Sequence, residues 1–253
     1  MYKLTRMIEF QQLTRTYGDF TAVEPLSLTV QRGEVFGFLG PNGAGKTTTI
    51  RMMMGILVPS GGRALINGLD CHGERALVQR QVGYLPANPI YYDFLRGREI
   101  LQFVAEMHGM ARGDAEQHAV RMLTEFGLEE VVDEFAVNYS MGMKKKLGLA
   151  CALIHDPQVL ILDEPINGLD PRAARDVQER LKQAAAAGKT IFMSTHLLDM
   201  AEKVCTRVGI IHRGELVATG SLEELRQRVD ENASLEEVFL KVTDEGTVEA
   251  PGP

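Results

Sequence analysis

The sequence predicts an α/β fold: a mixed, largely parallel sheet with an N-terminal antiparallel β-layer and an inserted α-helical subdomain. Three observations favour this class. Alternating apolar and polar residues open the chain, short continuous apolar runs recur later, and a long stretch of helical periodicity lies between the later runs. Continuous apolar runs are typical of parallel strands, because helices cover both faces of a parallel sheet.

The antiparallel layer is predicted from residues 8–13 and 26–30, where apolar and polar side chains alternate. Alternation places the apolar side chains on one face of a strand, so that each strand is half-buried. Residues 31–33 include a glycine and read as a turn before the next apolar run. The chain therefore opens with a β-layer.

The parallel strands are predicted from three apolar runs, residues 35–39, 159–163 and 190–194. A glycine-rich loop over residues 40–45 follows the first run, and a methionine-rich helix over residues 46–55 follows the loop. This order of strand, loop and helix is a unit of open α/β sheets.

The C-terminal half continues the pattern. Residues 171–187 form a predicted helix with proline at its start and Gly188 after its end, as helix termini favour. Residues 208–211 and 215–218 read as a hairpin, and residues 221–229 as a helix.

Helical periodicity dominates the middle of the chain, most clearly over residues 99–107 and 115–126. We interpret this stretch as a helical subdomain inserted into one domain of residues 8–220. The predicted boundaries are residues 8–86 and 157–220 for the core, 87–156 for the insertion, and 221–253 for short C-terminal helices and a tail disordered from residue 243.

The composition is acidic, with 34 Asp and Glu against 27 Lys and Arg and a net charge of -7. Such a chain lacks a broad positive surface, so no nucleic-acid partner is expected. Cys71, Cys151 and Cys205 show no CxxC spacing, which fits packing residues in a reducing compartment. No signal-peptide stretch follows residues 1–6, and every apolar run is far shorter than the ~20 residues that cross a bilayer. Membrane association is expected only through a partner.

Residues 40–48 match the pattern GxxxxGK[ST] between a predicted strand and a predicted helix, which indicates a P-loop NTPase core. Glycines let backbone N–H groups converge on phosphates, and the helix adds its positive dipole end. We expect Lys46 to reach the β- and γ-phosphates of ATP and Thr47 to ligate magnesium. A chance glycine-rich turn is the alternative, which the flanking elements disfavour. The predicted nucleotide ligands here are Gly40, Pro41, Asn42, Gly43, Ala44, Gly45, Lys46, Thr47 and Thr48.

Two acidic residues, Asp163 and Glu164, end the apolar run that starts at residue 159. Ligands of open α/β sheets bind at such strand ends. Asp163 is predicted to hold magnesium through water, and Glu164 to orient and deprotonate the attacking water. Alone, Glu164 could equally be a surface carboxylate that caps the next loop. The upstream phosphate loop favours the catalytic role.

Residues 139–144, Tyr-Ser-Met-Gly-Met-Lys, distinguish this chain from other P-loop ATPases. They resemble the signature sequence of the ABC transporter ATPases. The resemblance covers roughly residues 8–220, and its order of motifs is specific. The other residues that carry it are Tyr17, the phosphate loop, residues 84–86, Asp163, Glu164, residues 167–170 and His196.

The resemblance implies a head-to-tail dimer, in which each ATP lies between the phosphate loop of one subunit and the signature of the other. Ser140 and Gly142 would bind the partner's γ-phosphate at a helix N-terminus. Tyr17 would stack on adenine, Asp170 would line the dimer seam, and His196 would sense the γ-phosphate. A lone histidine is more often structural. The place of this one, just after a predicted strand, favours function.

Three positions depart from the family pattern, and a neighbour of one of them could compensate. Ala87 stands where family members carry Gln or Glu, which contacts magnesium and the attacking water; Asn88 could substitute through a one-residue shift. Met141 and Met143 replace the usual glycine and glutamine, which predicts an altered grip on ATP across the seam. Hydrolysis is still predicted, because the phosphate-loop and strand-end residues are present.

The lysine run at residues 144–146 has two interpretations. A solvated helix face is the first, since cations near a helix N-terminus oppose its dipole. The second is that one lysine attracts the partner's nucleotide.

The resemblance also implies a biological role: an ATP-hydrolysing subunit that binds the inner face of the cell membrane from the cytoplasm and powers export through a separate transmembrane permease. The second nucleotide-binding subunit would complete a homodimer or a heterodimer. The alternatives are an importer subunit, a soluble ABC-type ATPase acting on ribosomes or chromosomes, and a kinase. A kinase would have no use for the signature, and the spacing between the motifs is too short for the coiled coil of a chromosome protein.

Overall fold

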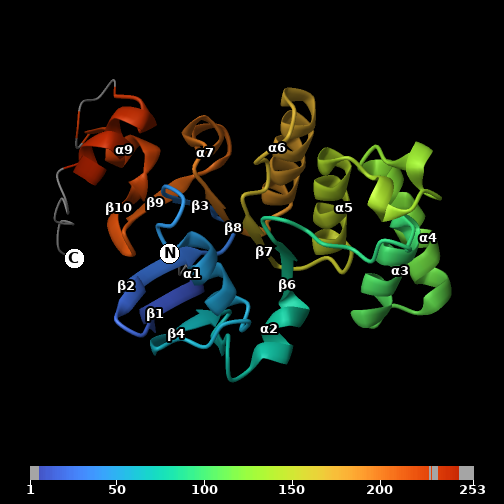
Figure 1. Ribbon diagram of the computed structural model, residues 1–253, viewed down its shortest axis with the longest axis horizontal. Helices are drawn as coiled ribbons and strands as arrows, with labels where there is room; N and C mark the ends of the chain where they lie inside the picture. Colours follow the sequence, from blue (N-terminus) through green and yellow to red (C-terminus); the bar gives the residue numbers. More distant parts are fainter. Residues whose placement is uncertain (1–5, 228, 230–232, 245–253) are drawn as a thin grey trace.

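The computed structural model describes residues 6–227, 229 and 233–244. A six-stranded sheet forms its centre (Figure 1), and five consecutive strands of it run parallel. The sixth strand, at one edge, forms a hairpin with its neighbour and is antiparallel to it. The strands, in spatial order, are β10 (Glu215–Ser221), β9 (Arg207–His212), β3 (Val35–Leu39), β8 (Thr190–Thr195), β7 (Val159–Asp163) and β6 (Val82–Leu85).

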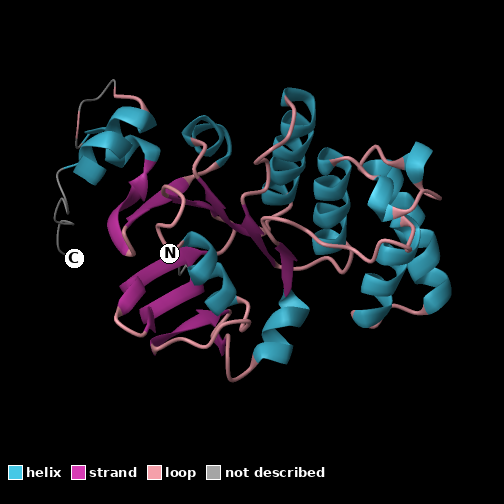
Figure 2. Ribbon diagram, viewed as in Figure 1, coloured by secondary structure: helices cyan, strands magenta, loops and turns pink. Residues whose placement is uncertain are grey.

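A four-stranded antiparallel sheet packs beside the central one (Figure 2). Its long strands curve, since the pairing between the first two shifts register at several points. In spatial order the strands are β2 (Phe20–Gln31), β1 (Arg6–Tyr17), β4 (Gly61–Ile66) and β5 (Leu69–Asp70). The predicted N-terminal β-layer is therefore present, with longer strands than the sequence pattern indicated.

Helices cover both faces of the central sheet, and three of them, α3, α4 and α5, gather at one end of the molecule (Figure 1). These three lie between β6 and β7 in the chain, together with two short 3-10 turns, 129–131 and 136–138. The α-helices are α1 (Lys46–Met53), α2 (Arg75–Gln81), α3 (Gly97–Met107), α4 (Arg112–Glu125), α5 (Met141–Leu153), α6 (Pro171–Ala186), α7 (Leu198–Val204), α8 (Leu222–Gln227) and α9 (Leu235–Asp244).

Two hydrophobic cores lie on opposite faces of the central sheet. Period-two alternation sends Phe36, Phe38 and Phe192 toward α1 and the antiparallel sheet, while Leu39 and Met193 face the other core. The ring of Phe192 lies 5.5 Å from that of Phe38 and 5.7 Å from that of Phe36 between centroids. Such aromatic packing holds β3 and β8 in register, and both strands end at the predicted nucleotide site.

The predicted fold class is confirmed, and the differences lie in short elements. Five elements were not predicted from the sequence, because each is seven residues or fewer and carries a weak periodic signal: β4, β5, α2, β6 and α7. The prediction of disorder from residue 243 was wrong for Thr243 and Asp244, which end helix α9. The remainder of that tail, residues 245–253, lies outside the described residues.

Candidate functional site

The phosphate loop joins the buried strand β3 to helix α1. Gly43 and Gly45 adopt φ of 83° and 104°, in the left-handed region that favours glycine. At Gly40 a Cβ would lie 2.4 Å from the carbonyl oxygen of Ile211. The loop therefore needs glycine at these positions, and it delivers the unpaired N–H groups at the start of α1 to the site.

Lys46 is the first residue of α1 and is 6% exposed. Its Nζ donates to the carbonyls of Gly40 at 2.7 Å and Pro41 at 3.1 Å. It also lies 3.3 Å from Oε1 of Glu164. The ammonium is thus held over the loop, where it can exchange the carboxylate for a phosphate.

Asp163 ends strand β7 and is almost fully buried. Its carboxylate accepts hydrogen bonds from the hydroxyls of Thr47, at 2.9 Å, and Ser194. Carboxylate and hydroxyl oxygens are the donors that magnesium prefers. The two residues predicted to hold the metal, Asp163 and Thr47, therefore adjoin each other although 116 positions separate them.

Glu164 follows in a backbone conformation that is unusual for a residue with a side chain, with φ of 49°. Left-handed non-glycine residues are strained and cluster at functional sites. Its N–H donates to the carbonyl oxygen of Ser194 at 3.1 Å and to the Ser194 hydroxyl at 3.2 Å. Both carboxylate oxygens lie 3.0 Å from Nδ1 of His196. The carboxylate is therefore oriented between a histidine and the phosphate-loop lysine.

A cavity of about 380 Å³ opens beside these residues. It brings together Tyr17, most of the phosphate loop and Glu164, as predicted. Tyr17 is half-exposed, and the guanidinium of Arg15 lies 4.4 Å from its ring centroid. Lining residues that the sequence analysis did not single out for this cavity are Phe20, Ala22 and Asn167.

The signature residues lie elsewhere. Ser140 is the N-cap of α5, and its hydroxyl accepts the N–H of Met143 at 3.2 Å. Ser140, Gly142 and Asp170 line a different cavity, of about 430 Å³. Asp170 caps α6, and hydrogen bonds from the backbone of Ala173 and Arg172 hold its pKa below the ordinary value. Within one chain, therefore, the signature does not reach the phosphate loop, which is the arrangement a shared dimer site requires.

The lysine run does not form a solvated face. Lys145 is buried, and its Nζ donates to the carbonyl oxygens of Ala87 at 2.6 Å and Glu164 at 2.7 Å. Burial lowers the pKa of Lys145, and the charges of Asp163 and Glu164 oppose that shift. The first interpretation was wrong at this position, because the tertiary fold turns this side chain toward the strand end.

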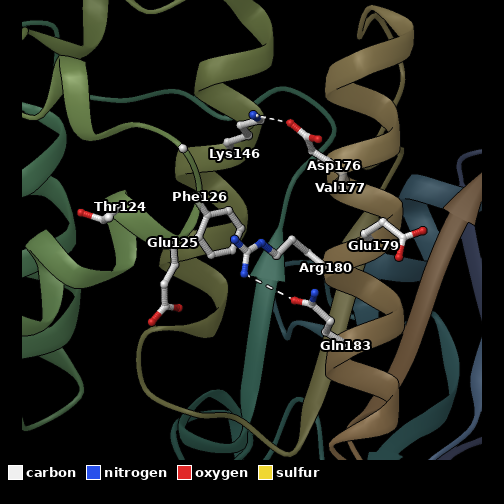
Figure 3. Close-up of a pocket in the computed structure, with 10 residues that line it drawn as sticks. Thr124, Glu125, Phe126, Lys146, Asp176, Val177, Glu179, Arg180 and Gln183 are labelled. Atoms are coloured by element: carbon white, nitrogen blue, oxygen red, sulfur yellow. Dashed lines mark hydrogen bonds and ion pairs between the residues drawn. The ribbon is translucent and has the colours of Figure 1, made fainter.

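Lys146 points toward helix α6 (Figure 3), where its Nζ lies 2.7 Å from the carboxylate of Asp176. This pair spans the edge of a cavity of about 330 Å³ between the α4–α5 region and α6. Across the same cavity the guanidinium of Arg180 lies 4.9 Å from the ring centroid of Phe126. These contacts tie the helical end of the molecule to the core.

The three cysteines are free thiols. Cys71 and Cys205 are buried and Cys151 is half-buried. Burial raises the pKa of Cys71 to about 12, so its thiol stays protonated and unreactive near neutral pH. Their interpretation as packing residues agrees with this environment.

The described residues include no helix both long and apolar enough to cross a membrane. Comparisons with known proteins agree with the site geometry. Residues 23–167 match the family model described as "ABC transporter".

Two curated relatives and one solved structure are similar over most of the chain. The probable multidrug ABC transporter ATP-binding protein YbhF of Escherichia coli is 36% identical over 241 residues, which is 93% of this chain but only 41% of that protein. The linearmycin resistance ATP-binding protein LnrL of Bacillus subtilis is 34% identical over 223 residues, 88% of this chain and 72% of that protein. A solved ATP-binding subunit of an ABC transporter superposes with a TM-score of 0.86 and 34% identity, covering 94% of this chain and 99% of that one.

The matched residues include the phosphate loop, the signature helix, and strand β7 with Glu164 directly after it. The structure supplies the same parts in working proximity: a buried lysine on the loop, a hydroxyl beside a buried carboxylate, and a carboxylate next to a histidine. These parts make up the nucleotide-binding half of an ATPase. The chain therefore belongs to the ABC transporter family, as an ATP-binding protein with an ABC-type ATPase domain.

Proposed function

We propose that this chain is the ATP-hydrolysing subunit of an export-type ABC transporter whose cargo crosses the membrane through a separate permease subunit. One observation carries the hydrolytic part: the carboxylate of Glu164 lies within 3.3 Å of Lys46 and 3.0 Å of His196, beside the phosphate loop. A base that can activate water is thus held beside the group that binds phosphates.

In the proposed mechanism, ATP enters the cavity and its phosphates draw the Lys46 ammonium away from Glu164. The freed carboxylate orients a water molecule toward the γ-phosphate and accepts its proton, a role worth about 10²–10⁴-fold in rate. His196 keeps the carboxylate aligned and contacts the γ-phosphate. Tyr17 stacks on the adenine.

Magnesium would be held by the Thr47 hydroxyl and, through water, by the Asp163 carboxylate. These two groups are already hydrogen-bonded to each other. The ion supplies positive charge that offsets the charge building up on the transferred phosphoryl group. Ser194 orients the carboxylate from the opposite side.

The second half of each site would come from another nucleotide-binding subunit. Ser140 and Gly142 begin helix α5, and their separation from the phosphate loop leaves them free to meet a partner's γ-phosphate. Asp170 would line the seam between the subunits. The pair is either two copies of this chain or this chain with a homologue.

The proposed permease contact is the loop after β6 together with α3. Ile90, Tyr92 and Phe94 are 92%, 77% and 86% exposed, and Phe103 and Met107 extend the apolar surface along the helix. Exposed apolar groups of this size mark protein interaction sites. The loop begins next to Ala87, which lines the nucleotide cavity. A movement of the cavity wall on ATP binding would therefore displace this apolar surface.

Two relatives support export as the direction, since one is named for probable multidrug transport and another for linearmycin resistance. The protein would accordingly lie on the cytoplasmic face of the membrane, held there by its permease. The cargo is chosen by the permease, which alone would contact it.

Glu164→Gln tests the proposal. The variant should bind ATP, lose at least about 100-fold in hydrolysis rate, and accumulate as an ATP-bound dimer on size-exclusion chromatography. Lys46→Ala should fail to bind ATP. Wild-type hydrolysis by Glu164→Gln would disprove the catalytic assignment.

The partner is tested by capturing the ATP-trapped variant from detergent-solubilised cells of the native source, followed by mass spectrometry. A polytopic membrane protein is the expected companion. Recovery of ribosomal or chromosomal proteins without any membrane protein would instead favour a soluble ABC-type ATPase.

A further inference from the structure

The strained backbone at Glu164 is clamped on both sides. Its N–H is shared between the carbonyl and hydroxyl oxygens of Ser194, from strand β8. Its carbonyl oxygen accepts two hydrogen bonds, one from the Lys145 ammonium of helix α5 at 2.7 Å and a longer one from the N–H of Asn167 at 3.3 Å. A residue with φ of 49° persists only where its surroundings hold it, and Lys145 supplies the shorter of the two contacts on the carbonyl side.

The cost of burying Lys145 indicates that its charge is used. Lys145 is only 2% exposed, so its ammonium has lost most of its hydration, which is costly for a charged group. Packing of the apolar stem does not explain why a charged group is buried here, because an uncharged side chain of the same length would pack equally well. The ammonium contacts two backbone carbonyls, those of Ala87 and Glu164, at 2.6 and 2.7 Å.

These two carbonyls belong to different parts of the site. Ala87 lines the nucleotide cavity at the point where the chain leaves β6, and Glu164 lines it where the chain leaves β7. Ala87 has no side chain that could bind water or metal. The Lys145 ammonium therefore connects the Ala87 segment and the Glu164 segment through their backbone carbonyls. The methyl side chain of Ala87 cannot make such a connection.

We propose that Lys145 is a positioning residue for hydrolysis: by bonding the carbonyls of Glu164 and Ala87, it fixes the backbone from which the Glu164 carboxylate projects. Lys145 acts through Glu164 and does not touch the nucleotide. The inference rests on the proposed role of Glu164 as the base.

Lys145→Met tests this role, since it keeps the length of the buried stem and removes the ammonium. The kcat for ATP hydrolysis should fall at least about tenfold, a fraction of the 10²–10⁴-fold that a general base contributes. The KM for ATP should change less than about twofold, because the phosphate loop is untouched. Lys145→Arg, which retains donors for both carbonyls, should recover most of the loss. Lys182→Met on the exposed face of α6 is the matched control and should leave both constants unchanged.

A double variant separates positioning from a general loosening of the fold. If Lys145 acts only through the carboxylate, Lys145→Met should cause little further loss in single-turnover hydrolysis when Glu164 is already Gln. An equal loss in both backgrounds, an unchanged kcat, or a loss confined to KM would each overturn the proposal. Should Lys145→Met fail to fold, Lys145→Gln is measured in the same scheme and decides by the same outcomes.

Failure of the two proposals is distinguishable. Full activity of the single variant Glu164→Gln would disprove the assignment of Glu164 as the base. Loss of activity in Glu164→Gln together with full activity in Lys145→Met would disprove only the positioning role of Lys145.

Discussion

Replacing Ser194 with alanine should destabilise the protein without removing any nucleotide contact. The Ser194 hydroxyl is fully buried and donates to the buried carboxylate of Asp163. A hydrogen bond to a charged group contributes about 1.5–3 kcal/mol, roughly twice a neutral one. Thr47 remains as a second donor to the carboxylate, and the N–H of Glu164 retains the carbonyl oxygen of Ser194. The expected loss in free energy of unfolding is therefore about 2 kcal/mol.

Urea unfolding followed by circular dichroism, without nucleotide or metal, measures this loss. Ser27→Ala is the comparison variant: it removes an exposed hydroxyl on β2 that accepts two neutral hydrogen bonds from Gln12, where water can take its place, and it should cost less than about 1 kcal/mol. In an Asp163→Asn background the acceptor is neutral, so Ser194→Ala should cost only about 1 kcal/mol. Stability within 0.5 kcal/mol of wild type, or the same loss in both backgrounds, would refute the reasoning.

Two other variants probe the cavity and the helical end. Tyr17→Ala should raise the Kd for a fluorescent ATP analogue about tenfold, because stacking on a base contributes about 1–3 kcal/mol. Tyr17→Phe keeps the ring and should bind as wild type does. Equal Kd values for all three proteins would exclude stacking. Burial and the stacked ring of His108, 3.6 Å away between centroids, lower the pKa of His155 to about 4 from 6.5. Because the folded state then binds fewer protons than the unfolded state, stability is complete above about pH 6.5 and falls as the pH drops toward 4, by at most about 1.4 kcal/mol per pH unit. His155→Phe should reduce this acid dependence in urea titrations between pH 7 and 4, whereas His72→Asn, at an exposed position, should not. Identical pH profiles for wild type and His155→Phe would contradict the assignment of the acid dependence to His155.

Much of the site could be predicted because its residues follow strand ends. Lys46 and Thr47 stand in a contiguous loop motif, and Asp163 and Glu164 end a continuous apolar run. Parallel strands bring their carboxyl ends to one edge of the sheet, so proximity follows once the strands are recognised. The roles of Ser140, Asp170 and His196 needed the resemblance to a family, since a lone polar residue carries no comparable pattern.

Ser194 and Lys145 were missed as parts of the site. The partners of each lie on other elements, and local periodicity does not reveal which elements become neighbours. A signal for Lys145 did exist: Leu149 and Ala152, four and seven positions further along α5, are buried, so this lysine shares their inward face. The run of three lysines masked that signal, because charge runs are usually read as solvated.

The sequence by itself determined the α/β class, the phosphate loop, the strand-end carboxylates and the family, because these depend on residue types at fixed short spacings. Only the tertiary structure decided which hydroxyl orients Asp163, which of three lysines is buried, and why a left-handed glutamate is tolerated. These depend on contacts between β7, β8 and α5, which distance along the chain does not encode. Desolvation sets their energies, and a group's solvation is known only when the surrounding chain has folded around it.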